Sequence, residues 1–309
     1  MPPTSKLRIA LIGLGDIADK AYLPLMTTHP GVEPVLCTRD ADKLSELAAR
    51  YRIAETYTDL SDLLDHRPDA AMVHSATESH AALVTALLEA GIPTFVDKPL
   101  SDSLTASAGL IDLARAKNCP LFVGFNRRYA PLISALKAKD AAIQMTWHKN
   151  RVDLPGDPRR FVFDDFIHVV DSLRFLGEGP VRHFTVHTRM RGDGLANVQV
   201  RWLQGDCLLT GGMNRVSGIT EETVEYYTPG HKWQIEELHR GYHYHGNQTD
   251  RLGFGNWTPT LEQRGFGAMI DHWIAVVRGK PLPPDYLDGV LESHRLCEEI
   301  VGRVGDSLL

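Results

Sequence analysis

The first 125 residues alternate short apolar runs with longer segments whose apolar positions recur every three or four residues. Apolar runs of this length are typical of buried strands, and the amphipathic segments between them are typical of helices. Strands are expected in LRIALIG, VEPVLCT, AAMVHSA, PTFVDKP and PLFVGF, with helices from about Asp16, from about Ala41, over 79–90 and over 103–117. The alternation predicts right-handed βαβ units and a doubly wound parallel sheet, the Rossmann arrangement.

The pattern changes after Asn126. Longer segments with polar alternation follow, HFTVHTRMR, NVQVRWLQ and DCLLTGG, and they predict an antiparallel sheet with one exposed face. Helical periodicity returns at about 161–176, 261–278 and 287–303. We therefore predict an α/β protein of two domains, a nucleotide-binding Rossmann domain over 1–123 and an α+β domain over 124–309 with an open, mostly antiparallel sheet.

A small-residue motif lies between the first expected strand and helix. It reads G-x-G-x-x-A, and small residues there allow a tight turn and a close approach of a pyrophosphate to backbone N–H groups at the positive end of the helix. The strand before it and the helix after it strengthen this interpretation. The predicted cofactor contacts in this turn are Gly13, Gly15, Asp16, Ile17 and Ala18.

The end of the second expected strand bears on the choice between NAD and NADP. An acidic residue usually binds the ribose hydroxyls of NAD at this position, but here the sequence has Thr38 followed by Arg39. A hydroxyl and a guanidinium can bind a 2′-phosphate, which a carboxylate would repel. NADP is therefore favoured over NAD. The alternative is that Arg39 is solvated and Asp40 binds the ribose.

Composition and charge narrow the class of protein. The 309 residues are 43% hydrophobic and 23% charged, with a formal charge of −6, which argues against nucleic acid as the main partner. No apolar run approaches the length of a membrane span and no signal-peptide pattern is seen, so a cytoplasmic location is expected. The four cysteines are widely scattered and show no spacing of a zinc site.

The segment DDFIHVVD concentrates titratable groups. At helical spacing Asp164, His168 and Asp171 share one stripe, which is compatible with a metal site, a proton-handling pair or a polar helix face. Lys98 ends the expected strand PTFVDKP, where doubly wound folds place their ligands, although a surface lysine would be the default there without the glycine motif.

The chain resembles the Gfo/Idh/MocA oxidoreductase family. The resemblance extends over essentially its whole length. The matching pieces are GLGDIA, HSATESH followed by LLEAG, VDKPL in place of Glu-Lys-Pro, VGFNRRYAP, and DDFIHVVDSLRFLG in place of the Asp-x-Gly-x-His helix. Five segments are similar to the MviM-type branch, namely VHSATESH, VDKPL, GFNRRYAPL, DDFIHVVD and TLEQRGF. The resemblance implies a substrate-binding C-terminal domain and a homodimer or homotetramer formed through its sheet.

The resemblance also implies roles for individual residues. Lys98, Asp164 and His168 match the three residues that surround the reacting carbon beside the nicotinamide. Three departures are Asp97 in place of Glu, Ala76 in place of Pro, and Phe166 in place of Gly, which adds bulk near the pocket. Further cofactor contacts carried over or expected beside these are Ser75, Ala76, His80, Asp97, Lys98 and Asn126.

The chemistry can be argued from the residues as well. Oxidation of a secondary alcohol needs a base for the hydroxyl proton, and His168 titrates near neutrality. Asp164, one turn earlier, can orient the ring, with Asp165 as a competitor, and Lys98 can stabilise negative charge on the oxygen. Asp171 is interpreted as a structural charge. Since the lysine supplies the positive charge, no metal is expected at these residues.

Other polar residues have two interpretations. Substrate contacts are expected from Asn126, Arg127, Lys149 and Arg151, with salt bridges at the domain junction as an equal alternative. Gln263 and Arg264, in TLEQRGF, fit either the pocket or an oligomer contact. His239, His243 and His245 are explained without zinc by a polar aromatic hairpin, in which the last two share one face of a strand.

The sequence thus predicts an NADP-dependent oxidoreductase that transfers hydride between nicotinamide and a secondary alcohol or ketone of a sugar-like or other small carbonyl substrate. A catalytically idle NADP-binding sensor on the same fold is the alternative. Retention of Lys98, Asp164 and His168 favours the enzyme, because a sensor needs only the cofactor end.

Overall fold

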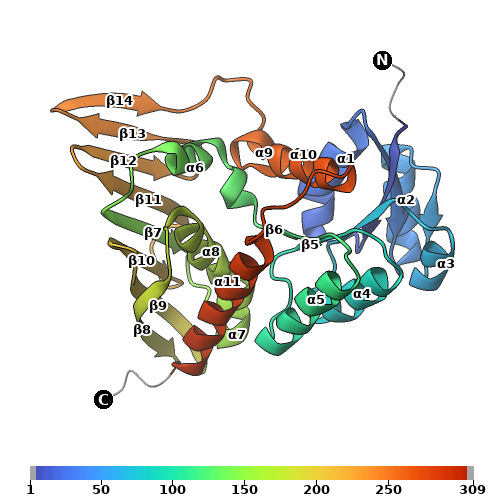
Figure 1. The fold of residues 1–309 in the computed structure, drawn as a ribbon, viewed down its shortest axis with the longest axis horizontal. Coiled ribbons are helices and arrows are strands. Elements are labelled where there is room, and N and C mark those ends of the chain that lie inside the picture. Colours follow the sequence, from blue (N-terminus) through green and yellow to red (C-terminus); the bar gives the residue numbers. More distant parts are fainter. Residues whose placement is uncertain (1–4, 305–309) are drawn as a thin grey trace. The chain divides into compact units, whose positions relative to one another are not determined.

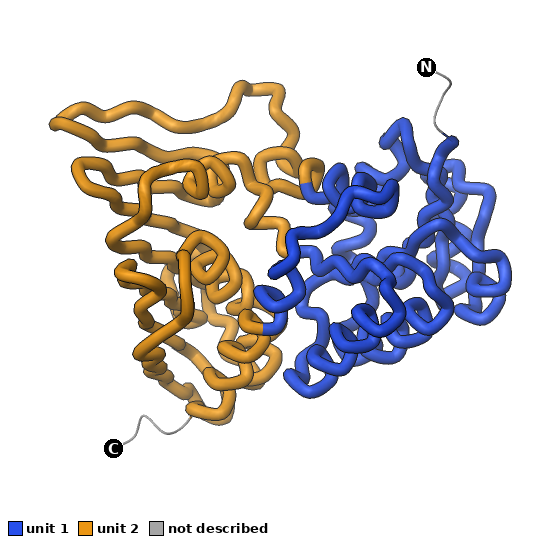
Figure 2. Tube along the Cα trace, in the orientation of Figure 1, with its two compact units in different colours: residues 1–124, 269–291 blue, residues 125–268, 292–309 orange. Residues whose placement is uncertain are grey.

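The structure is a computed structural model that describes residues 5–304. These residues form two compact units, drawn in different colours in Figure 2. Unit 1 contains the described residues up to 124 together with 269–291, and unit 2 contains 125–268 together with the described residues from 292 onward. The sequence assigned everything after residue 123 to the second domain, whereas segment 269–291 clusters with the first.

Aromatic packing explains why segment 269–291 joins unit 1. Trp273 lies on α10 (Phe266–Val277), and its ring centre is 6.1 Å from that of Phe95 and 5.8 Å from that of Phe122. The hydroxyl of Tyr286, at the start of α11 (Tyr286–Gly302), accepts from the backbone N–H of Val123 at 2.9 Å. These contacts are between residues far apart in sequence, so no local pattern predicts them.

Unit 1 is built on a six-stranded parallel sheet in the order β3-β2-β1-β4-β5-β6. Its strands are β1 (Leu7–Ile12), β2 (Val32–Cys37), β3 (Thr56–Tyr57), β4 (Ala70–Val73), β5 (Thr94–Asp97) and β6 (Leu121–Gly124). The predicted doubly wound Rossmann sheet is confirmed. The strand order reverses between β1 and β4, and this switch point is where open α/β sheets bind their ligands.

Helices cover both faces of this sheet. They are η1 (Ala18–Tyr22, a π-helical turn), α1 (Leu23–Thr28), α2 (Ala41–Tyr51), α3 (Leu60–Asp65), α4 (Thr77–Glu89), α5 (Leu104–Ala116) and the unit 1 parts of α10 and α11. Figure 1 shows α4 and α5 side by side on one face and α1 with α10 on the other. Phe95 of β5 faces the second group, because its ring contacts Tyr22 as well as Trp273.

Unit 2 is built on an eight-stranded sheet in the order β14-β13-β12-β11-β7-β10-β9-β8. Its strands are β7 (Gln144–Asn150), β8 (Val181–Arg191), β9 (Gly194–Gln204), β10 (Cys207–Asn214), β11 (Glu221–Thr228), β12 (His231–Glu236), β13 (Arg240–His245) and β14 (Gln248–Leu252). β7 runs parallel to β10 and every other pair is antiparallel. The predicted mostly antiparallel sheet is therefore confirmed.

One face of the unit 2 sheet carries the helix that bears the predicted catalytic residues. α8 (Ile167–Leu176) packs on β7 and β10. Gly211 of β10 allows this approach, because a Cβ there would lie 3.0 Å from Val169 and 3.1 Å from Leu173. The shorter helices of unit 2 are η2 (Asn126–Tyr129), α6 (Pro131–Ser134), η3 (Ala135–Ala138), α7 (Pro158–Arg160), the π-helical η4 (Phe161–Phe166) and α9 (Thr260–Gln263).

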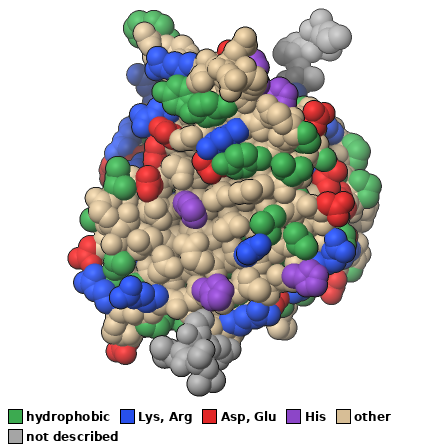
Figure 3. All heavy atoms as spheres, turned by 90° about the vertical axis from the view of Figure 1, so that its left-hand side faces the viewer, with side chains coloured by type: hydrophobic (Ala, Val, Ile, Leu, Met, Phe, Trp, Pro, Cys, Tyr) green, Lys and Arg blue, Asp and Glu red, His purple; other side chains and the backbone are tan. Residues whose placement is uncertain are grey.

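The other face of the sheet carries half-buried polar side chains. On adjacent strands Thr146 and His148 of β7, Thr210 of β10 and Gln199 of β9 alternate with residues that are buried beneath α8. In Figure 3, which views the side of the molecule where these strands lie, charged side chains are most frequent near the margin, and single Lys or Arg side chains and histidines lie farther in, among uncharged surface.

Candidate functional site

The turn after β1 has the geometry that the glycine motif predicts. Gly13 has a φ of +83°, and a Cβ at this position would lie 2.6 Å from the backbone N and Cα of Ser75. Gly13 is therefore required both by its backbone conformation and by the close approach of the loop after β4. A Cβ on Gly15 would meet nothing within 4 Å.

The start of the following helix is open to a ligand. Gly15, Asp16 and Ile17 are exposed and Ala18 is buried, and among the described residues the side chain of Ile17 provides no cap for the π-helical turn that begins at Ala18. Unsatisfied N–H groups at a helix N-terminus favour an anion. The residues present thus fit the pyrophosphate of a dinucleotide, at the sheet's switch point.

Three residues follow the end of β2, Thr38, Arg39 and Asp40, and they differ in exposure and in their hydrogen bonds. Thr38 is half-buried and Arg39 is exposed. The carboxylate of Asp40 accepts from the backbone N–H of Lys43 at 3.0 Å and so caps α2. The carboxylate of Asp40, the residue after Thr38 and Arg39, is therefore directed to its own helix.

His80 ties together the two loops that follow β4 and β5. It is buried, with Nδ1 2.8 Å from the carbonyl oxygen of Pro99 and Nε2 3.0 Å from that of Ser75. The hydroxyl of Ser79 donates to that of Ser75 at 2.7 Å, and Ala76 is the exposed residue before α4. His80 therefore fixes the backbone of the predicted cofactor loop from behind.

Lys98 follows β5 and is half-buried, joined to Pro99 by a cis peptide bond. Asp97, which stands where the family has a glutamate, accepts from the Tyr22 hydroxyl at 2.7 Å. Burial, together with Asp97, raises the pKa of Tyr22 well above its ordinary value, so its hydroxyl stays protonated and donates. The contact holds the strand end that carries the lysine.

His74 is a buried residue beside this site that the sequence analysis did not identify. It is 3% exposed, its ring is stacked on Tyr22 with centres 3.9 Å apart, and neither ring nitrogen has a hydrogen-bond partner among the described residues. Burial lowers its pKa to about 3, so the ring is neutral. The available signal was a histidine at the end of the apolar strand AAMVHSA, directly before Ser75.

In unit 2 the predicted catalytic helix begins with a π-helical turn. Phe161–Phe166 has this form, and the regular helix α8 follows from Ile167. Asp164 is exposed and His168 is 7% exposed, while Asp165 is directed toward the sheet strands. Turns of this kind occur frequently at functional sites.

Arg127 lies directly against His168. Its Nη1 atom is 3.1 Å from both ring nitrogens, a position above the ring plane, because in the plane it would collide with the carbon between them. Nε and Nη2 donate to the two carboxylate oxygens of Glu222 at 3.1 and 2.9 Å, and Nη1 also donates to Asn126. The guanidinium is therefore fixed, with a positive charge over the histidine.

Asn126 completes this arrangement. Its side-chain amide donates to the carbonyl oxygen of Arg264 at 2.9 Å. Gly265 has a φ of +80°, and a Cβ there would lie 2.3 to 2.5 Å from backbone atoms of residues 126–130. The motif TLEQRGF thus packs against GFNRRYAP within unit 2, which gives Arg264 a structural contact through its backbone.

The carboxylate of Asp165 forms ion pairs with three basic side chains. It accepts from Lys149, from Arg151 at 3.1 Å and from Arg215 at 3.1 Å. Burial raises the pKa of Asp165, but Lys149 and Arg151 outweigh this and hold it below its ordinary value. Burial also lowers the pKa of Lys149 to about 7, with Arg127 adding to the effect. Two predicted substrate ligands, Lys149 and Arg151, therefore form ion pairs with this carboxylate.

Glu222 is the second residue that the sequence analysis missed. It is 5% exposed and also accepts from the indole N–H of Trp147 at 3.1 Å. Although burial raises its pKa, Arg127 and Lys149 lower it to about 2, so it is ionised. The signal was a glutamate at an inward position of the alternating segment EETVEYYT.

Asp171 forms a buried ion pair. Arg128 donates to both of its oxygens at 2.8 and 2.5 Å, and the Ser293 hydroxyl donates at 2.8 Å. The guanidinium of Arg128 also stacks over Phe125 and Phe175. With its carboxylate used in this way, Asp171 has the structural role that the sequence suggested rather than that of a metal ligand beside His168.

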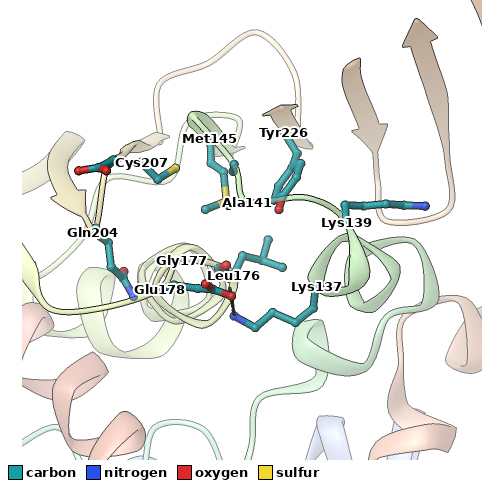
Figure 4. A pocket seen from close by; sticks show the side chains of 13 residues that line it. Lys137, Lys139, Ala141, Met145, Leu176, Gly177, Glu178, Gln204, Cys207 and Tyr226 are labelled. Atoms are coloured by element: carbon teal, nitrogen blue, oxygen red, sulfur yellow. Dashed lines mark hydrogen bonds and ion pairs between the residues drawn. The ribbon is translucent and has the colours of Figure 1, made fainter. Parts of the chain in front are cut away.

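A cavity of about 210 Å³ in unit 2 is formed by other residues (Figure 4). Lys137 extends toward Glu178, with the charged atoms 3.7 Å apart, and burial raises the pKa of Cys207 to about 11. The lining includes none of the predicted site residues, and it consists of Lys137, Lys139, Ala141, Ala142, Met145, Leu176, Gly177, Glu178, Gln204, Gly205, Asp206, Cys207 and Tyr226.

Within residues 5–304, no helix is both long enough and apolar enough to cross a bilayer.

Two family models match the chain. Residues 7–125 match an oxidoreductase family with an NAD-binding Rossmann fold, Gfo/Idh/MocA, and residues 129–244 match a YceM-like C-terminal domain. YceM of Salmonella typhimurium is 33% identical over 300 residues, which are 95% of this chain and 97% of that protein. Both units are therefore covered.

Solved structures are similar to this chain over nearly its whole length. The crystal structure of a Gfo/Idh/MocA family oxidoreductase from Vibrio cholerae is 40% identical, with a TM-score of 0.93 over 98% of this chain and 99% of that one. A dehydrogenase (MviM) from Clostridium difficile is 26% identical, with a TM-score of 0.88 over 96% and 99%. A shorter match is the myo-inositol dehydrogenase Hyg17 of Streptomyces leeuwenhoekii, 37% identical over 138 residues, which are 44% of this chain and 42% of that protein.

Proposed function

Because the chain belongs to the Gfo/Idh/MocA family of NAD(P)-dependent oxidoreductases, we propose that it transfers hydride between NADP and a secondary alcohol or ketone of a sugar-like or other small carbonyl substrate. The observation that carries the proposal is His168 on α8, held against an arginine that Glu222 and Asn126 fix in place. The inositol dehydrogenase among the relatives supports a polyhydroxylated substrate.

When bound, the nicotinamide accepts or donates the hydride. In the oxidative direction His168 takes the proton of the substrate hydroxyl as the carbonyl forms, and in the reductive direction it returns that proton. Arg127, which Glu222 and Asn126 hold in place, contacts the ring of His168. Lys98 stabilises the negative charge that develops on the substrate oxygen, and Asp164 orients His168.

NADP is proposed over NAD on the side chains at the end of β2. Arg39 is exposed and can pair with a 2′-phosphate, and Thr38 can add a hydrogen bond. Asp40, the residue that would favour NAD, is occupied as the helix cap of α2.

The test is a screen of inositols, sugars and small ketones for reduction of NADP or oxidation of NADPH by the purified full chain. Turnover with at least one polyhydroxylated compound is expected. Lys98→Ala and His168→Ala should each reduce it by a factor of about 10² to 10⁴, with NADPH binding kept. Tight NADPH binding without turnover on any compound would instead favour a sensor.

We also propose a homodimer or homotetramer formed through the unit 2 sheet. Its face opposite α8 carries the half-buried Thr146 and Thr210, with the charged Glu225 and Arg201 directly across from them on the neighbouring strands. Sedimentation equilibrium should give a mass of two or four chains, and Thr146→Glu together with Thr210→Glu, which adds two like charges to this face, should lower it. A monomeric mass for the unchanged protein at micromolar concentration would contradict this assembly.

A further inference from the structure

Histidines gather on one face of the outer end of the unit 2 sheet, where β12, β13 and β14 lie side by side (Figure 1). His243 and His245 are two residues apart on β13, so they point to the same face. Asp250 of β14 lies directly across from His243, and His231 of β12 lies directly across from His245. The register thus brings four potential ligand side chains together.

Three of these side chains converge. His245 Nε2 is 2.7 Å and His243 Nδ1 is 3.7 Å from Oδ2 of Asp250, and one ligand atom from each residue lies within 4.8 Å of the other two. Among the described residues this is the group with that geometry. We propose that His243, His245 and Asp250 bind a divalent transition-metal ion of the Zn²⁺ class.

The ring of His243 is oriented for this role. Its Nε2 lies 2.9 Å from Nδ1 of His231. If Nε2–H donates to His231, the lone pair of Nδ1 faces Asp250. Histidines that bind metals usually donate their other ring N–H in this way, which fixes the tautomer. Trp233 stacks on the same ring, with centres 4.4 Å apart and planes 6° from parallel.

The ligand set and its freedom to adjust fit such an ion. Two imidazoles and one carboxylate suit Zn²⁺, Ni²⁺ or Cu²⁺, and three protein ligands leave a position for water. Bond lengths of about 2.0–2.2 Å place tetrahedral ligand atoms roughly 3.3–3.6 Å apart. The His245–Asp250 pair, at 2.7 Å, must therefore open by roughly 0.6–0.9 Å, and a pair at the 4.8 Å limit must close by about 1 Å. The side chain of Asp250 is 62% exposed and can rotate to do so.

The charges nearby set the affinity. Asp250 contributes one negative charge, while Lys139 lies with its ammonium 5.6 Å from the centre of the Trp233 ring and opposes a cation. The ion would link β13 to β14, which pairs with β13 alone.

The sequence predicted a hairpin without metal and grouped His239 with His243 and His245. In the structure Nδ1 of His239 instead lies 3.2 Å from the carbonyl oxygen of Glu237. The residues that lie beside His243 and His245 are His231 and Asp250.

The first test is a calorimetric titration in which Zn²⁺ alone is added to the metal-free, tag-free full chain. One equivalent should bind. His243→Ala and His245→Ala should each weaken binding at least about 100-fold, and His231→Ala, which changes only a positioning residue, about 10- to 100-fold. His239→Ala is the matched control and should bind as the unchanged protein does. NADPH binding by every variant serves as the check on folding.

The second test reads out the site directly. Co²⁺ in place of Zn²⁺ should give visible absorption bands that His243→Ala abolishes, and Zn²⁺ should slow amide exchange in β14 of the unchanged protein only. Equal Zn²⁺ affinity in the unchanged protein and in the His243→Ala/His245→Ala variant would overturn the proposal, as would the absence of a one-equivalent site.

Discussion

Asp164 and Asp165 are neighbours in sequence with opposite surroundings. Asp164 is exposed, whereas the Asp165 side chain is 14% exposed and accepts from three cationic side chains. No rule of helical spacing separates them, because the π-helical turn places Asp165 toward the strands. The difference lets the structural and catalytic roles be tested on adjacent residues.

We expect Asp165→Asn to lower the free energy of unfolding by about 3–5 kcal/mol, because it leaves Lys149, Arg151 and Arg215 without their shared carboxylate. Asp164→Asn should change it by no more than about 0.5 kcal/mol while reducing turnover. Urea unfolding of both variants measures the difference. Equal destabilisation would mean that Asp165 is not the centre of an ion-pair network.

His74 should make the protein sensitive to acid. Its pKa is lowered to about 3 in the folded state, so between that value and its ordinary 6.5 the unfolded chain binds a proton that the folded protein does not. Stability therefore falls as the pH falls through this window, by about 1.4 kcal/mol per pH unit. His74→Leu should remove this part of the pH dependence, as followed by urea unfolding at several pH values. His187→Leu, at an exposed position on β8, should leave it intact.

Arg39 is predicted to distinguish the two cofactors. Arg39→Ala should weaken NADPH binding about tenfold or more and leave NADH binding within about twofold, because only NADPH carries the 2′-phosphate. Fluorescence titration with each nucleotide measures both constants. Tighter binding of NADH than of NADPH by the unchanged protein would contradict the preference.

At the scale of elements, the two glycines of the β1 turn have different tasks. Gly13 needs both its positive φ and the space beside Ser75, whereas Gly15 has neither constraint. Gly13→Ala should lower the free energy of unfolding by at least about 1–2 kcal/mol. Gly15→Ala should leave stability within about 1 kcal/mol but weaken NADPH binding, because its Cβ would occupy the approach of the pyrophosphate.

Thermal unfolding and nucleotide titration of both variants separate these effects. Undiminished NADPH affinity in Gly15→Ala would show that the cofactor does not approach the turn at this residue.

The sequence predicted the elements whose patterns are local. The five Rossmann strands and the helices after them follow from apolar periodicity and turn residues. The short β3 and the strands β7, β11 and β12 were not predicted, and β13 and β14 were predicted only as a polar aromatic hairpin. In β7 and β11 the reason is that Lys149 and Glu222 occupy inward positions. Charged residues there disguise the alternation, and only the tertiary pairing with Arg127 and Asp165 explains their burial.

The candidate site was predictable to a similar extent. Gly13, Lys98 and His168 could be found from motifs, since each occupies a fixed place in a turn, strand end or helix. The partners of these residues could not. Tyr22 reaches Asp97 across 75 positions of sequence, and Arg127 reaches Glu222 across 95.

At the scale of the molecule, both units contribute residues to the proposed reaction. The chain leaves unit 1 after β6, forms the unit 2 sheet, returns to unit 1 along α10 and passes into unit 2 again within α11. Lys98 and the dinucleotide turn belong to unit 1, and Asp164 and His168 belong to unit 2. The proposed hydride transfer thus uses residues of both units.

The most direct test of this account is the turnover number of His168→Asn, measured with NADPH and the best compound of the screen, beside the NADPH dissociation constant of the same variant. We expect turnover to fall by a factor of about 10² to 10⁴ while the dissociation constant changes less than about twofold. Turnover equal to that of the unchanged protein would contradict the proposed role of His168 in proton transfer.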